Sequence, residues 1–274
     1  MNLSDRGELV GFLRKHGLAA DKSLGQHFLA DPIVISAIVA AAGEYKSFLE
    51  VGPGPGIITS FLCKKAEGIA VEFDPRMVRL LTDSSPNCKV VVADALKVNL
   101  AELLTSLPEP RALVSNMPYY ITGPLLERFS GVRQHYTRAV LMMQKEVGEK
   151  ILAQPGNRTR GSLSVNLQSQ FNISHVVDAP GSCFLPPPKV DSVVLLFEPR
   201  LDTFPTLFPK VVKAGCSQPR KTLINNLGAT FRLPRAEVAA VTNACSLSEL
   251  ARGCDLTEAH WIELATQAEV AGWK

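Results

Sequence analysis

The stretch SFLEVGPGPG at residues 47–56 decides the fold of this chain. Its first half is a short, mainly apolar run bounded by glycine, which is the pattern of a buried strand. Gly52, Gly54 and Gly56 follow directly, and the next residues, 57–65, have the apolar spacing of a helix. Glycine allows a sharp turn and lets backbone N–H groups approach a ligand closely. The stretch therefore predicts a strand, a ligand-binding loop and a helix, which together open an α/β sheet.

The same alternation of strand and helix continues as far as residue 153. The apolar runs are typical of parallel strands covered on both faces, and their alternation with helical patterns predicts a doubly wound α/β sheet. We expect strands at 47–51, 68–73, 88–94, 111–116 and 138–144, and helices at 57–65, 75–84, 100–107, 122–130 and 145–153.

Two further helices are expected before the sheet. Ser4 is the predicted cap of a helix over 5–17, because serine often accepts a hydrogen bond from the first turn. Asp31 and Pro32 are predicted to start the second helix, which ends at Gly43.

The last quarter of the chain has a different pattern. Residues 164–180 and 190–200 are predicted as longer strands at an antiparallel edge, and the proline-rich segment 199–209 then breaks the alternation. We place a domain boundary there, with residues 1–199 as an α/β domain and 200–274 as a small helical domain. Helices are expected at 210–216, 222–230, 235–244, 246–253 and 257–272.

The composition sets limits on function. The 274 residues carry a net charge of +3, and 46% of them are apolar, so a packed globular protein is expected and a nucleic-acid partner is permitted. No run of about 18 apolar residues predicts a membrane span. The six cysteines are scattered without a CxxC pair, which favours free thiols in a reducing cytoplasm and predicts no metal site.

Two acidic residues end the strands that follow the glycine loop. Glu72 lies 20 residues beyond Gly52, a spacing that suits a carboxylate bound to ribose hydroxyls. Asp94 ends the third strand, where a carboxylate can bind an adenine amino group. Ligands of such sheets lie beyond the carboxyl ends of the strands. A dinucleotide is the alternative ligand, but the loop departs from GxGxxG, and S-adenosylmethionine, which has ribose and adenine without phosphate, fits better.

The fourth strand ends in VSNMPYYITG at residues 114–123. An adenine amine is a poor nucleophile, because its lone pair is delocalised into the ring. Asn116 Oδ1 and the backbone carbonyl of Met117 are candidates to accept its two N–H bonds and to direct that lone pair. Pro118 fixes the turn, and Tyr119 offers a flat face on which a base can stack.

The turn NMPY matches [ND]-x-P-[YF], the signature of amino methyltransferases at the fourth strand. Further motifs along the chain are SLGQHFLADP, EVGPGPGIIT, MMQKEVGEKI, RGSLSV and CFLPPPKVDSVV. Together, in matching order over roughly residues 20–230, these motifs resemble the 16S ribosomal RNA dimethyladenosine transferases.

The resemblance implies a class I S-adenosylmethionine-dependent enzyme with a Rossmann-like sheet. Its product is N6,N6-dimethyladenosine at two adjacent adenosines near the 3′ end of small-subunit ribosomal RNA, formed during 30S assembly. A cytoplasmic monomer without metal is expected. The implied donor-binding residues are His27, Leu29, Gly52, Gly54, Glu72, Asp94 and Asn116.

The resemblance also implies residues that contact RNA. Phe184 matches an aromatic that sandwiches the target base against Tyr119, and the second domain matches one that binds RNA. The candidate phosphate contacts are Arg220 and Lys221, extended by Lys189, Arg158 and Arg160.

Other functions stay open at this point. The large-subunit ribosomal RNA adenine methyltransferases of macrolide resistance share the donor site and the chemistry. A DNA adenine-N6 methyltransferase lacks support, because no separate sequence-reading domain is visible. A non-catalytic ribosome-assembly factor is the alternative outside enzymes.

Overall fold

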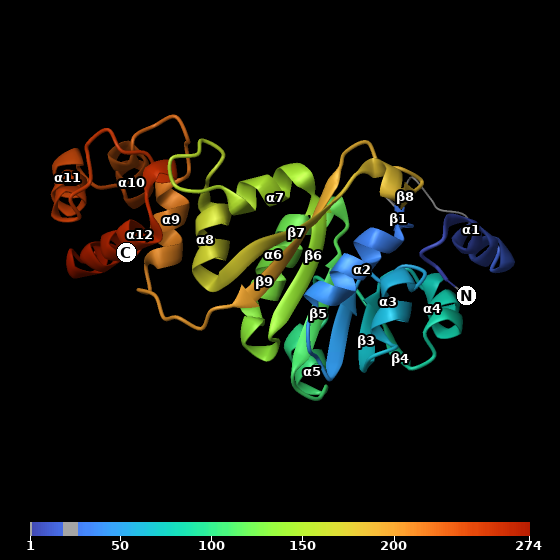
Figure 1. Ribbon diagram of the computed structural model, residues 1–274. Helices are drawn as coiled ribbons and strands as arrows, with labels where there is room; N and C mark the ends of the chain where they lie inside the picture. Colours follow the sequence, from blue (N-terminus) through green and yellow to red (C-terminus); the bar gives the residue numbers. More distant parts are fainter. Residues whose placement is uncertain (1, 19–26) are drawn as a thin grey trace. The chain divides into compact units, whose positions relative to one another are not determined.

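The computed structural model describes residues 2–18 and 27–274, and the chain divides into two compact units (Figure 1). The first unit comprises Met1–Gly148 and Ile173–Pro199, and the second comprises Glu149–Asn172 and Arg200–Lys274. Part of the SLGQHFLADP motif, residues 23–26, lies outside the described residues.

A seven-stranded sheet with the strand order β4-β3-β2-β5-β6-β9-β7 forms the centre of the first unit. The parallel strands are β2 (Ser47–Val51), β3 (Glu67–Glu72), β4 (Cys88–Val92), β5 (Arg111–Asn116) and β6 (Arg138–Gln144). On the other side of β6, β9 (Ser192–Pro199) runs antiparallel and is followed by β7 (Phe171–Ala179). A separate two-stranded sheet joins β1 (Phe28–Leu29) to β8 (Phe184–Leu185). The α/β prediction is confirmed.

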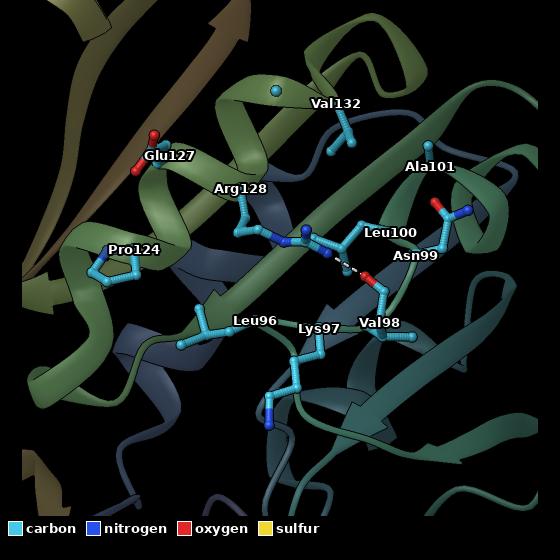
Figure 2. Close-up of a pocket in the computed structure, with 11 residues that line it drawn as sticks. Leu96, Lys97, Val98, Asn99, Leu100, Ala101, Pro124, Glu127, Arg128 and Val132 are labelled. Atoms are coloured by element: carbon cyan, nitrogen blue, oxygen red, sulfur yellow. Dashed lines mark hydrogen bonds between the residues drawn. The ribbon is translucent and has the colours of Figure 1, made fainter.

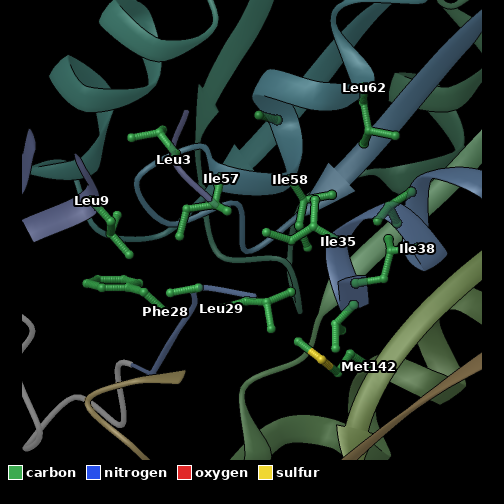
Figure 3. Close-up of a cluster of buried hydrophobic side chains, with 14 of the residues drawn as sticks. Leu3, Leu9, Phe28, Leu29, Ile35, Ile38, Ile57, Ile58, Leu62 and Met142 are labelled. Atoms are coloured by element: carbon green, nitrogen blue, oxygen red, sulfur yellow. The ribbon is translucent and has the colours of Figure 1, made fainter. Parts of the chain in front are cut away.

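The helices of the first unit are placed where the sequence predicts them. They are α1 (Arg6–Lys15), α2 (Pro32–Ala41), α3 (Ile57–Leu62), α4 (Met77–Ser84), α5 (Leu100–Thr105) and α6 (Thr122–Gly131). Helix α7 (Lys145–Leu152) follows β6, and its residues from Glu149 onward belong to the second unit. Figure 3 shows one apolar cluster in which α2 and α3 pack with β1 and with Met142 of β6. This cluster continues into α1 and α4, so it holds the segments around the glycine loop in place.

The cap of α1 differs from the prediction. Asp5, not Ser4, is the residue at this position, and its carboxylate accepts a hydrogen bond of 2.9 Å from the backbone N–H of Glu8. The Ser4 hydroxyl instead donates to Asn2 Oδ1 at 2.7 Å. A carboxylate at a helix start also interacts favourably with the helix dipole, so aspartate is the better cap here.

The predicted strand over 164–180 is wrong in its first half, because α8 (Ser162–Gln170) precedes β7. The Ser164 hydroxyl donates to the carbonyl of Lys150, and the Gln168 amide donates to the carbonyl of Ile151 at 2.7 Å. The two partners of these contacts are 14 and 17 residues apart in the chain. The local alternation of apolar and polar residues therefore could not reveal them.

The segment 200–274 is helical, as predicted, but the second unit also contains Glu149–Asn172, which the sequence analysis assigned to the α/β domain. Its helices α9 (Phe208–Gly215), α10 (Leu223–Phe231), α11 (Arg235–Ala244) and α12 (Glu258–Val270) surround the fully buried Trp261, and α8 contributes Val165 to the same core. The expected helix at 246–253 is absent. Ser246 has a left-handed backbone (φ 56°), and a side chain at Gly253 would lie 2.8 Å from the carbonyl oxygen of Gly215. The segment therefore packs as an irregular chain against the end of α9.

Candidate active site

The carboxyl ends of four parallel strands surround a cavity of about 990 Å³ in the first unit. Loops after β2, β3, β4 and β5 line it together with residues of β1. The predicted donor-site and turn residues that line it are His27, Leu29, Gly52, Gly54, Glu72, Asp94, Asn116, Met117, Pro118 and Tyr119.

The glycine loop needs glycine for its backbone conformation. Gly52, Gly54 and Gly56 all have left-handed φ values, of 72°, 57° and 87°, which cost other residues about 1–2 kcal/mol. A Cβ atom at Gly54 would also lie 3.3 Å from the ring of Phe28. The loop can therefore turn sharply at the floor of the cavity, with α3 starting directly after Gly56.

Glu72 holds the loop from the neighbouring strand. Its Oε2 accepts the backbone N–H of Gly54 at 2.9 Å, and its Oε1 accepts that of Asp74 at 2.8 Å. The side chain is buried, and burial raises its pKa, although these backbone hydrogen bonds oppose the shift. Each carboxylate oxygen keeps a further lone pair, so the group can still accept two ribose hydroxyls.

Asp94 lies at the next strand end, beyond β4. Its Oδ1 accepts the backbone N–H of Leu96 at 2.9 Å, and its Oδ2 lies 3.6 Å from Nζ of Lys97. These contacts fix the carboxylate beside the cavity, where it can accept the amino group of an adenine.

The turn after β5 is closed by several hydrogen bonds. The backbone N–H of Met117 donates to the carbonyl of Met142 at 3.0 Å, and that of Ile121 donates to the carbonyl of Pro118 at 3.1 Å. Asn116 is adjacent to the glycine loop, since a Cβ atom at Gly52 would lie 3.6 Å from its carbonyl oxygen. Asn116 and the glycine loop are therefore neighbours on one cavity wall.

Tyr119 is half-buried and lines the same cavity. Its hydroxyl lies 2.7 Å from Ser192 Oγ of β9, and burial raises its pKa. Its ring is nearly parallel to that of His27, with the ring centroids 6.3 Å apart. His27 Nδ1 lies 2.8 Å from the carbonyl oxygen of Pro186 and donates to it, which leaves Nε2 as the acceptor of the neutral ring.

Phe184 is not brought to the cavity. Its side chain is 1% exposed, belongs to the apolar cluster of the first unit and is absent from the cavity lining. The pairing of β8 with β1, Phe184 with Leu29, turns it into this core. Stacking on the target base stays a prediction, and it requires the side chain to leave its present position.

Glu50 is a cavity residue that the sequence reasoning missed. It lines the cavity from β2 and is 1% exposed. Burial, assisted by the nearby Cys63 and Glu72, raises its pKa from 4.5 to about 8. The sequence feature that indicates this residue is a single acid within the mainly apolar run at 47–51. The glycine loop that follows is the more conspicuous feature of the same stretch.

A second cavity of about 600 Å³ lies beside α6 (Figure 2). Arg128 extends from α6 and donates a hydrogen bond to the carbonyl of Val98, so it connects the two walls of this second cavity. Leu96 lines both cavities, so the second one adjoins the first.

The predicted RNA contacts differ in exposure. Arg220 and Lys221 are exposed in the turn before α10, and Arg158 and Lys189 are also exposed. The prediction for Arg160 is wrong, because it is 5% exposed and donates to the carbonyl of Ala153 at 2.7 Å. Arg160 therefore braces the second unit and forms no part of an exposed basic surface.

Neither a metal cluster nor a membrane helix is found in the described part of the chain. Within residues 2–18 and 27–274, no three His, Cys, Asp or Glu side chains gather closely enough to hold a metal ion. No described helix combines the length and apolar character that a membrane crossing needs.

The glycine loop after β2 donates a backbone hydrogen bond to Glu72, the acid that ends the neighbouring parallel strand β3. This arrangement is that of the class I S-adenosylmethionine-dependent methyltransferases. A crystal structure of a dimethyladenosine transferase from Plasmodium falciparum has a similar fold, with a TM-score of 0.77, 26% identity, and coverage of 90% of this chain and 99% of that one. Residues 17–264 match the family described as ribosomal RNA adenine dimethylase, and the chain belongs to this family.

Two bacterial relatives support the family assignment over nearly the whole chain. A ribosomal RNA small subunit methyltransferase A from Geobacter sulfurreducens is 39% identical, covering 95% of this chain and 99% of the relative. One of the same name from Desulfitobacterium hafniense is 38% identical, with 87% and 88% covered. The crystal structure of the 23S rRNA methyltransferase ErmE shows a shared fold, with a TM-score of 0.68. It is 24% identical, and the match covers 88% of this chain and 99% of that one.

Proposed function

We propose that the chain transfers methyl groups from S-adenosylmethionine to N6 of two adjacent adenosines near the 3′ end of small-subunit ribosomal RNA. The observation that carries the proposal is the turn from Asn116 to Tyr119, which lines the same cavity as the glycine loop and Glu72. The names of the bacterial relatives support the small subunit as the source of the substrate.

The residues that would hold the methyl donor fit its chemistry. Glu72 faces a cavity of sufficient size with both carboxylate oxygens already oriented by backbone N–H groups, which suits two ribose hydroxyls. Asp94 would accept the adenine amino group, and His27, just before β1, and Leu29 of β1 would cover the donor. When bound, S-adenosylmethionine supplies an electrophilic methyl group.

Asn116 and Met117 would orient the nucleophile. Two carbonyl acceptors on the two N–H bonds of the adenine amine favour a pyramidal nitrogen, whose lone pair then points toward the methyl carbon. The amine nitrogen would receive the methyl group that bound S-adenosylmethionine supplies, and its extra proton would leave afterwards to water. A strong general base is therefore unnecessary.

The target adenosine must leave its stack to reach Tyr119, which costs a few kcal/mol. Loops of RNA release a base more readily than duplexes do, so a structured loop of the small-subunit RNA in an immature 30S particle is the proposed partner. We further propose that the second unit is an RNA-binding domain, with Arg220 and Lys221 on phosphates, and that the enzyme works as a monomer in a bacterial cytoplasm.

The test is methyl transfer from labelled S-adenosylmethionine to undermethylated 30S subunits, with 50S subunits as the control and nucleoside digestion to identify the product. Dimethyladenosine in 30S RNA alone is expected. Label in 50S RNA would favour the resistance-type reaction, and donor binding without any label would favour an assembly factor.

A further inference from the structure

Tyr120 lies at the opening of the donor cavity. Its side chain is 75% exposed and yet belongs to the cavity lining. Its neighbour Tyr119 is half-buried, and the Tyr119 hydroxyl is bound to Ser192. The two adjacent tyrosines therefore have different environments, one within the wall and one at its rim.

The backbone at Tyr120 is held rigidly although the side chain is exposed. Tyr119–Ile121 forms a 3-10 turn after Pro118, and the Thr122 hydroxyl lies 3.3 Å from each of the carbonyl oxygens of Pro118 and Tyr119. A 3-10 turn has three residues per turn, so successive side chains point about 120° apart. Tyr120 is thus fixed in a direction that diverges from that of Tyr119.

The position of Tyr120 along the cavity indicates which ligand it faces. Phe73, which is 73% exposed, also lines the cavity, but it follows Glu72 at the end of β3. Strands β3 and β5 lie on opposite sides of β2. Phe73 is therefore on the ribose side of the cavity, and Tyr120 is on the Asn116 side, where the RNA base enters.

We propose that Tyr120 stacks on the base next to the target adenosine and so positions the RNA strand at the cavity opening. When the target base leaves its stack, the adjacent base loses a stacking partner. An exposed aromatic on a fixed backbone beside the entry point replaces that partner, because single-stranded RNA is bound mainly by stacking on such side chains. The inference rests on the proposed function, and it adds a positioning residue beside Tyr119.

Replacing Tyr120 by leucine and by phenylalanine tests this role. Tyr120→Leu keeps an apolar side chain without a ring, and its KM for undermethylated 30S subunits should rise about 5- to 150-fold, the range of one lost base stack. Tyr120→Phe keeps the ring and should restore the KM of the unchanged enzyme. The affinity of both variants for S-adenosylmethionine, measured by calorimetry without RNA, should equal that of the unchanged enzyme.

Three results would overturn the inference. They are an unchanged KM in Tyr120→Leu, failure of Tyr120→Phe to restore it, and weaker donor binding in Tyr120→Leu, which would place the ring on the cofactor. Failure of the unchanged enzyme to methylate 30S subunits would contradict the proposed function instead, so the two failures are distinguishable.

Discussion

At the scale of single residues, the site combines a buried carboxylate, proposed to bind the donor, with a neutral amide, proposed to orient the amine. Glu72 is buried and bonded by two backbone N–H groups, while Asn116 is neutral and lies at the next strand but one. A carboxylate beside the adenine amine would bind its protons more tightly, but it would also attract the positive charge of the donor. In the proposed mechanism, the neutral amide of Asn116 would act mainly by orienting the amine.

Asn116→Ala should retain donor binding within a few fold and lose turnover by on the order of 10²-fold, similar to the loss of one positioned hydrogen-bonding group in other enzymes. Single-turnover methylation of 30S subunits and calorimetry with S-adenosylmethionine measure the two effects. Glu72→Ala is the matched contrast and should weaken donor binding. Full turnover in Asn116→Ala would contradict the proposed alignment of the amine.

Glu50 should make stability depend on pH. Its pKa is about 8 in the folded chain against 4.5 ordinarily, so the folded state retains a proton that the unfolded state has released. The free energy of unfolding should therefore fall as pH rises from about 4.5 to 8, by at most about 1.4 kcal/mol per pH unit.

Urea unfolding at several pH values, with Glu50→Gln alongside, measures this contribution. The variant cannot ionise and should show a shallower decrease. Glu72 contributes with the same sign, because its pKa is also raised by burial, so part of the slope should remain. An identical slope in both proteins would refute the assignment to Glu50.

At the scale of elements, the strand ends determine the site. The predicted strands at 47–51, 111–116 and 138–144 agree with the structure to the residue, because each is a short and mainly apolar run. The residues that follow the first two could therefore be assigned to one cavity. The β1–β8 pairing joins residues more than 150 positions apart, and no local pattern reveals it. For that reason the pairing of Phe184 with Leu29 and the contact between His27 and Pro186 were not foreseen.

Gly54→Ala should disturb the loop between β2 and α3. The change imposes a left-handed conformation on alanine and brings its Cβ close to Phe28, so donor affinity should fall by roughly 5- to 30-fold, the equivalent of 1–2 kcal/mol. Calorimetry with S-adenosylmethionine measures this affinity.

Gly11→Ala provides the matched control. Gly11 lies within α1, and a Cβ atom there would meet nothing within 4 Å, so this variant should gain about 0.5–1 kcal/mol of stability and keep its donor affinity. Equal donor affinities in the two variants would show that the loop tolerates a side chain.

At the scale of the whole molecule, two units divide the proposed tasks. The first contains the donor cavity, and the second contains exposed basic residues before α10. The net charge of +3 alone does not distinguish an RNA-binding protein from an ordinary one; the location of the charges carries that inference.

Combined replacement of Arg220 and Lys221 by alanine should weaken binding to 30S subunits and leave donor affinity unchanged. If both contact phosphates, the slope of log affinity against log salt should become shallower by roughly 0.7–0.9 per lost contact. Binding measured at several salt concentrations gives this slope. Lys213→Ala, which removes an exposed cation of α9, is the control and should not change it.

The hydrogen bond between Tyr119 and Ser192 also has a consequence for the order in which the site is completed during synthesis of the chain. Ser192 begins β9, the strand that pairs with β6, and it lies 73 residues after Tyr119 in the chain. A nascent polypeptide that has emerged only as far as β6 thus contains the glycine loop, Glu72 and Asn116, but not the partner that holds Tyr119. The part of the cavity wall that would receive the base is therefore completed late in translation. A chain stalled before β9 is expected to lack an ordered position for Tyr119 and to leave the RNA unmodified.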